Sequence, residues 1–151
     1  MYNIDVVPHT KEKGGSGMQN PNSYIDSYEN VNAHIREVCN ALASGECQLD
    51  ILPTKKGQFE TDPFSTAYTM QTLEYDSSDV KRTLASLTAA DYIESIKDDK
   101  KLGSPDFRVF GIEISGKEIY IKEKLRSENK IFCISFHFAK YPLKDKPYNN
   151  R

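Results

Sequence analysis

The chain of 151 residues is 38% hydrophobic, 28% charged and 11% aromatic, which is typical of one globular domain with a single core. A mean hydropathy of -0.63 and the lack of a long apolar run exclude a protein embedded in a membrane. The formal net charge of -2 argues against a strongly basic nucleic-acid binder, although residues 117–151 carry nine basic and four acidic side chains. This region has a net charge of +5, and its field attracts polyanions; a solvated lysine-rich surface is the simpler interpretation.

Residues 1–28 are predicted to form a flexible extension. Lys11–Gly17 and Asn20–Ser23 are rich in turn-forming residues, and the whole segment has too few apolar residues to form a core. The first residues contain no apolar run after a basic start, so we expect no secretory signal and a cytoplasmic location. Three cysteines and three histidines are scattered, with no CxxC motif, and indicate neither a disulfide framework nor a metal site. We therefore expect no metal and no cofactor.

The first predicted helix follows this extension. Asn30 is predicted to cap the start of this helix, and Gly45 is predicted to end it in the left-handed backbone conformation. Residues 47–52 alternate and predict a short strand, and residues 54–66 are predicted to be a loop. The helix prediction depends on apolar residues at intervals of three and four, namely Val31, Ile35, Val38 and Leu42.

A second helical pattern begins at Ser77 or Ser78 and has its apolar face at Val80, Leu84 and Leu87. Thr88–Asp91 then resembles a capping box with Asp in place of Glu. This box predicts a third short helix, which carries Tyr92, Ile93 and Ile96 and ends before Gly103 and Pro105.

The last third of the chain is predicted to be a sheet. Residues 107–114, 118–125 and 131–138 are three alternating runs, and the short segments between them suit antiparallel hairpins. Helices followed by such a meander predict an α+β fold, with N-terminal helices packed on a C-terminal antiparallel sheet. We expect residues 29–151 to form this single domain.

Alternation divides the side chains of the last two strands between two faces. Keeping the apolar sides together places Tyr120 and Lys122 on one face with Ser135 and His137, with Tyr120 opposite either Ser135 or His137. The side chains expected to face the core are Ile119, Ile121, Leu125, Phe132, Ile134, Phe136 and Phe138. Those expected on the polar outer face are Tyr120, Lys122, Lys124, Cys133, Ser135 and His137.

A phenol, an ammonium and an imidazole on one face are the groups that metal-free RNA cleavage needs. Such cleavage takes a base for the 2′-hydroxyl, an acid for the leaving oxygen and cations for the phosphate. Histidine is the side chain that ordinarily titrates near neutral pH. The alternative interpretation is an ordinary exposed sheet surface, on which these residue types are common.

The strings Phe110–Lys122, Ile131–His137 and Tyr141–Leu143 resemble toxins of the MqsR family, particularly members of the Gram-positive type. Upstream, Ser86–Tyr92 is similar to the "sLTxxDfY" step of that family, and the resemblance covers roughly residues 31–148. It implies a RelE-like fold and a metal-independent RNA endonuclease of a type II toxin–antitoxin module. It also implies a cognate antitoxin, usually one that binds DNA.

The resemblance assigns roles to individual residues. Tyr120 matches the active-site tyrosine of the "IYIK" strand, and His137 lies at the "SF(K/H)" position, so both are expected to be catalytic. Lys122 matches the lysine two residues after that tyrosine, and Lys124 follows on the same face; both are expected to contact the phosphate or the RNA. Arg108 aligns with the glutamine of the "WQDVY" strand, where an arginine is able to clamp a phosphate.

The chain departs from the family at Glu94, because members often have a catalytic lysine there. Lys97 is expected to substitute for it if the segment is helical. Arg108 is in phase with Phe110 and reaches the outer face only through a bulge or an edge position. The acid at Glu94 suggests an alternative function, a RelE-like domain that has lost nuclease chemistry and acts as a binding or regulatory protein. An unrelated α+β domain is the third alternative.

Overall fold

The computed structural model describes residues 20–100 and 102–150, and in them three α-helices and a 3-10 turn accompany one six-stranded sheet. The strand order is β1-β3-β4-β5-β6-β2, and each neighbouring pair is antiparallel except β6 and β2. The fold is therefore α+β, as predicted. The elements are β1 Ser23–Tyr24, α2 Tyr28–Ala43, β2 Gln48–Ile51, α3 Thr66–Leu73, α4 Ser77–Ala85, η2 Ala89–Asp91, β3 Tyr92–Ile96, β4 Phe107–Ile114, β5 Lys117–Ser127 and β6 Lys130–Phe138.

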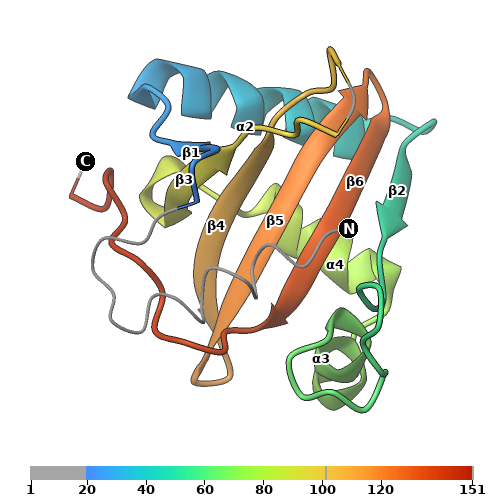
Figure 1. Ribbon diagram of the computed structural model, residues 1–151. Coiled ribbons are helices and arrows are strands. Elements are labelled where there is room, and N and C mark those ends of the chain that lie inside the picture. Colours follow the sequence, from blue (N-terminus) through green and yellow to red (C-terminus); the bar gives the residue numbers. More distant parts are fainter. Residues whose placement is uncertain (1–19, 101, 151) are drawn as a thin grey trace.

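Helices α2 and α4 pack behind the sheet in the view of Figure 1, and α3 lies beside the lower end of β6. We call the sheet face that contacts α2 and α4 the helix face. Its apolar residues form the main core with both helices, and they include Phe110, Ile119, Ile121 and Phe136. No helix among the described residues is long and apolar enough to cross a membrane.

The helix starts follow from local capping, although not at every predicted residue. Ser27, not Asn30, caps α2, because its side chain accepts a hydrogen bond from the Asn30 backbone N–H. Ser44 closes α2 in an extended conformation, so Gly45 does not supply the predicted left-handed end. Asp76, directly before Ser77, caps the start of α4 and forms a capping box with Asp79 in the first turn.

The predicted third helix is wrong. Thr88 and Asp91 do form the capping box, but it holds only the single turn η2, and Tyr92–Ile96 is strand β3. All five residues of β3 are buried, because Tyr92 packs in the core of the helix face, and Ile93 and Ile96 pack in an apolar cluster on the other face of the sheet. The pairing of β3 with β1 and β4 outweighs the local helical pattern, because five residues are too few to form a stable helix by themselves.

The three predicted C-terminal strands are confirmed as β4, β5 and β6, and the predicted strand at 47–52 as β2. Ile114 pairs with Lys117, so the β4–β5 hairpin closes through Ser115 and Gly116, both with positive φ. Two features were not anticipated. β2 joins β6 in parallel, and α3 follows the loop predicted for 54–66.

The extension predicted for 1–28 overlaps the described chain at residues 20–28, where the structure differs from that expectation. β1 pairs with β3 there, and the Asp26 carboxylate accepts a hydrogen bond from Arg108. The start of α2 also falls within this range. The remainder of that prediction, residues 1–19, lies outside the described residues.

A bulge in β6 changes the predicted division of its side chains. Lys122 pairs with Ser135 and Glu123 with Cys133, so Ile134 is an additional residue in the ladder. Phe132 and Ile134 therefore lie on the face opposite Phe136, and Cys133 joins the core of the helix face. The prediction that Phe132 and Ile134 share a face with Phe136, and that Cys133 lies on the polar face, is wrong.

Candidate functional site

The face of the sheet opposite the helix face carries the predicted site, and we call it the lysine face. It is defined by Tyr120, Lys122 and Lys124 of β5 and His137 of β6, together with a second apolar cluster. That cluster is Ile93, Ile96, Phe107, Val109, Phe132 and Ile134, with Leu52, Tyr120 and Leu143 packed against it.

Tyr120 and His137 are directly opposite each other in the β5–β6 ladder, which settles the register that the sequence left open. Their rings are stacked, with centroids 5.3 Å apart and an interplanar angle of 18°. His137 Nδ1 lies 2.9 Å from the backbone carbonyl oxygen of Phe138. A carbonyl oxygen only accepts, so Nδ1 is the donor in this contact.

Lys122 lies on the same face as this pair, diagonal to His137 through its own partner Ser135. Its Nζ is 5.0 Å from the centre of the Phe107 ring, a cation–π contact. The lysine is 1% exposed and His137 is 5% exposed. The expectation that this face is an outward polar surface is therefore wrong, because both of these polar side chains are buried.

Ser135 is a polar group of this site that the sequence analysis did not single out. It is fully buried between Lys122 and the bulge, and its Oγ has no hydrogen-bond partner. A buried hydroxyl normally has a partner, because leaving it without one costs about 1–3 kcal/mol. The Ser135 hydroxyl is therefore a further hydrogen-bonding group beside Lys122 and His137.

Lys124 lies on the lysine face but is engaged with the structure. Its Nζ is 2.5 Å from an Asp98 carboxylate oxygen and 2.9 Å from Ser104 Oγ, and it lies 4.5 Å from the centre of the Phe107 ring. Burial raises the pKa of Asp98, but the hydrogen bond and charge of Lys124 outweigh it and lower the pKa overall. Lys124 thus fixes Asp98 and Ser104 to the sheet.

The structure does not bring Arg108 to the site. It stays in phase with Phe110 and lies on the helix face, where its Nη2 is 2.8 Å from Asp26 Oδ2. The β3–β4 ladder has an irregularity at Tyr92 and Glu94, but Arg108 pairs regularly with Ser95. The bulge required to turn Arg108 to the other face is absent from this pair, so the structure places Arg108 on the face opposite Tyr120 and His137.

Glu94 and Lys97 also differ from the predicted arrangement. Because the segment is a strand, Lys97 is not one helical turn from Glu94, and it lies exposed after the end of β3. Glu94 pairs with Val109, and its two carboxylate oxygens lie 3.0 and 3.2 Å from Lys144 Nζ. An ion pair with the C-terminal segment therefore occupies the position at which the family often has a lysine.

Cys133 is fully buried on the helix face. Burial, with the Glu123 charge in addition, raises the pKa of its thiol above the ordinary range. Cys133 is therefore a packing residue and not a nucleophile. Among the described residues, no group of three or more His, Cys, Asp or Glu side chains is arranged to hold a metal ion.

The lysine face thus brings together Tyr120, Lys122 and His137, adds Ser135, and separates them from Arg108 and Lys97. Comparison of the chain with protein-family models, with curated proteins and with solved structures gave no match.

Proposed function

We propose that the protein is a metal-independent endoribonuclease of the MqsR type, with a RelE-like fold, and that it acts as the toxin of a type II toxin–antitoxin module in the cytoplasm. Its substrate is single-stranded or ribosome-associated mRNA, and its partner is an antitoxin that binds DNA. The observation that carries the proposal is the stacked Tyr120–His137 pair with Lys122 beside it on one sheet face.

The proposed chemistry is an intramolecular displacement. The 2′-oxygen attacks the adjacent phosphorus, the bond from phosphorus to the 5′-oxygen breaks, and a 2′,3′-cyclic phosphate remains. His137 Nε2 takes the proton of the 2′-hydroxyl or, when protonated, gives one to the leaving 5′-oxygen. Nδ1 is held by the Phe138 carbonyl, so the ring presents Nε2 in a fixed tautomer.

The neighbouring groups have supporting roles in this proposal. Tyr120 stacks on the imidazole and orients it, and its phenol is a proton donor at the scissile phosphate. Lys122 supplies positive charge where the phosphorane gains negative charge. Ser135 Oγ, which is buried without a partner, is available to a phosphate oxygen.

The test is induced expression in a bacterial host, with growth and total RNA integrity followed together. Wild type is expected to arrest growth and degrade RNA, and His137→Ala to lower cleavage by a factor of about 10²–10⁴, the usual contribution of acid–base catalysis. Tyr120→Phe removes a hydroxyl on the lysine face, and Tyr75→Phe is its matched control on the helix face. Cleavage by a folded His137→Ala at the wild-type rate would contradict the site assignment.

A second candidate function is a binding or regulatory protein without nuclease activity. It is favoured by the Glu94–Lys144 ion pair at the family's lysine position and by the low exposure of His137, since a ring that is 5% exposed offers little surface to RNA. Normal growth and intact RNA on induction, together with tight binding to the product of a neighbouring gene, would select this function over the nuclease.

A further inference from the structure

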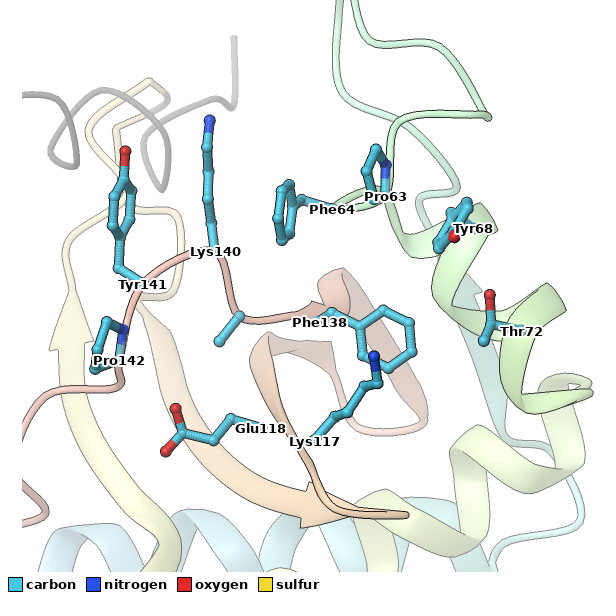
Figure 2. A pocket seen from close by; sticks show the side chains of 11 residues that line it. Pro63, Phe64, Tyr68, Thr72, Lys117, Glu118, Phe138, Lys140, Tyr141 and Pro142 are labelled. Carbon is cyan, nitrogen blue, oxygen red and sulfur yellow. The ribbon is translucent and has the colours of Figure 1, made fainter.

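A cavity of ≈470 Å³ opens where β5 begins and β6 ends. Figure 2 shows Phe64 and Tyr68 entering from the chain around the start of α3, and Lys140 and Tyr141 from the segment that follows β6. The lower end of β6 is fixed against α3, because the Phe136 and Phe138 backbone N–H groups donate to Thr66 and Thr69 Oγ1. The volume lies within the range of small-ligand sites, roughly 300–1,000 Å³.

Aromatic rings and lysine side chains alternate around this cavity. Lys140 Nζ lies 5.8 Å from the centre of the Phe64 ring and 6.0 Å from that of Tyr141, and Lys117 Nζ lies 5.4 Å from that of Phe138. Both lysines are exposed, and neither takes part in an ion pair within the described chain. The cavity therefore offers two positive charges beside flat apolar surfaces.

We propose that this cavity binds one nucleotide of single-stranded RNA, with the base stacked on the aromatic rings and the phosphate between Lys117 and Lys140. Ring stacking combined with lysine contacts to the backbone is how proteins hold unpaired bases. A peptide partner is the less suitable occupant, because two unpaired cations would face an apolar segment. The inference rests on the proposed function, since it names a subsite of that RNA substrate.

The cavity adjoins the Tyr120–His137 pair along both strands. Glu118 precedes Tyr120 by two positions on the same face of β5, and Phe138 directly follows His137 in β6. Because the Phe138 side chain lies on the helix face, a strand of RNA would pass from the cavity to the lysine face along Glu118. The cavity would position the chain, and the lysine face would carry out the chemistry.

Glu118 gives this subsite a base preference. One of its carboxylate oxygens accepts a hydrogen bond from the Leu143 backbone N–H at 3.3 Å, which holds the group at the cavity wall. A carboxylate accepts hydrogen bonds from an exocyclic amino group and is opposed by a carbonyl oxygen. We expect the subsite to prefer cytosine, whose N4 donates, to uracil, whose O4 accepts.

The experiment measures binding by fluorescence anisotropy, with labelled oligo(C) and oligo(U) of eight nucleotides. These oligonucleotides carry 2′-O-methyl groups, so they have no 2′-hydroxyl to attack the phosphorus and cannot be cleaved. Lys117→Gln and Lys140→Gln are expected to weaken binding and each to reduce the salt slope by about 0.7. Tyr141→Leu is expected to weaken binding about tenfold with an unchanged slope. Glu118→Gln is expected to abolish the preference for oligo(C).

The matched controls are Lys130→Gln, an exposed lysine at the opposite end of β6, and Phe59→Leu, an aromatic ring that is 78% exposed outside the cavity. Cavity variants that bind both oligonucleotides as the controls do, while wild type cleaves RNA, would overturn the inference and leave the proposed function intact. Cavity-dependent binding by a protein that never cleaves RNA would support the subsite and contradict the nuclease. Absence of oligonucleotide binding by wild type would overturn the inference outright.

Discussion

The two faces of the sheet bury charged side chains in different ways. On the helix face, carboxylates pair directly with side chains of other elements and tie the strands to them: Glu123 lies 2.7 Å from the His34 ring of α2, and Asp26 lies 2.8 Å from the Arg108 guanidinium. The lysine face also has direct ion pairs, Lys124 with Asp98 and Lys144 with Glu94. On this face, however, Lys122 and Lys124 also lie against the Phe107 ring, and the Tyr120 and His137 rings are stacked beside them.

This difference separates structural charge from charge arranged for chemistry. A direct buried ion pair uses both partners to hold two elements together, and its removal is a loss of stability. A contact with a ring face does not occupy the N–H donors of an ammonium group, and Lys124 Nζ donates to Asp98 and Ser104 while it lies against the Phe107 ring. Removing charge from the helix face, or Lys124 from Asp98, should therefore affect folding first. Changes at Tyr120, Lys122 and His137 should affect the proposed function first.

The largest loss of stability is expected from His34→Ala. The substitution leaves the Glu123 carboxylate, which is 1% exposed, without its ring partner. Breaking a buried pair in this way costs about 3–5 kcal/mol, which urea denaturation measures directly. The double variant His34→Leu with Glu123→Leu removes both polar groups and should recover most of that loss; a single variant as stable as wild type would show that the pair is not structural.

Arg108→Met tests whether Arg108 belongs to the helix face in function as well as in position. Removing the guanidinium from Asp26 is expected to cost about 1–3 kcal/mol of unfolding free energy and to leave RNA cleavage unchanged. A cleavage defect larger than the loss of folded protein would contradict this assignment and return Arg108 to the site.

The same variant has a pH signature. Burial raises the pKa of Asp26, but hydrogen bonds from Asn30 and Arg108 and the Arg108 charge outweigh it, so the pKa in the folded state is lowered. A lowered carboxyl pKa adds stability above its unfolded value, and that stability is lost as the pH falls through the folded value. Wild type should therefore lose stability below about pH 4, and Arg108→Met should lose less over this range.

The smallest expected effect concerns the packing of the C-terminal segment on the lysine face. A Cβ at Gly111 would lie 2.4 Å from Leu143 Cδ1 and 3.0 Å from Ile93 Cδ1. Since both are ends of side chains that can turn aside, Gly111→Ala should cost about 1 kcal/mol. A double-mutant cycle with Leu143→Ala should show a coupling energy of at least about 0.5 kcal/mol; strictly additive losses would mean that Leu143 does not pack there in solution.

Local sequence patterns were sufficient for the elements with long, regular signals. The alternation over 107–138 predicted β4, β5 and β6 and their hairpins, and the apolar spacing from Val31 predicted α2. The Tyr120–His137 neighbourhood followed from alternation alone, because two residues on paired strands with known apolar sides have few registers open to them. The prediction failed for strand β3 because its five residues are too few to show a clear alternation, and the preceding capping box indicated a helix.

Several features depended on contacts between residues far apart in the chain. The bulge at Ile134 turned Phe132 and Cys133 to unexpected faces, and no pattern within β6 distinguishes a bulged from a regular strand. The parallel pairing of β2 with β6, the Glu94–Lys144 pair and the cavity at the end of β6 join segments separated by tens of residues.

The sequence by itself determined the fold class, the C-terminal meander and the shared face of Tyr120, Lys122 and His137, because side-chain periodicity and turn residues act over a few positions. The tertiary structure alone decided that Arg108 pairs with Asp26, that Lys124 pairs with Asp98, and that His137 is buried. These outcomes depend on which charged groups come into contact when distant segments pack together. A charged group that is buried in this packing has to be paired, because burying a charge without a partner costs folding free energy.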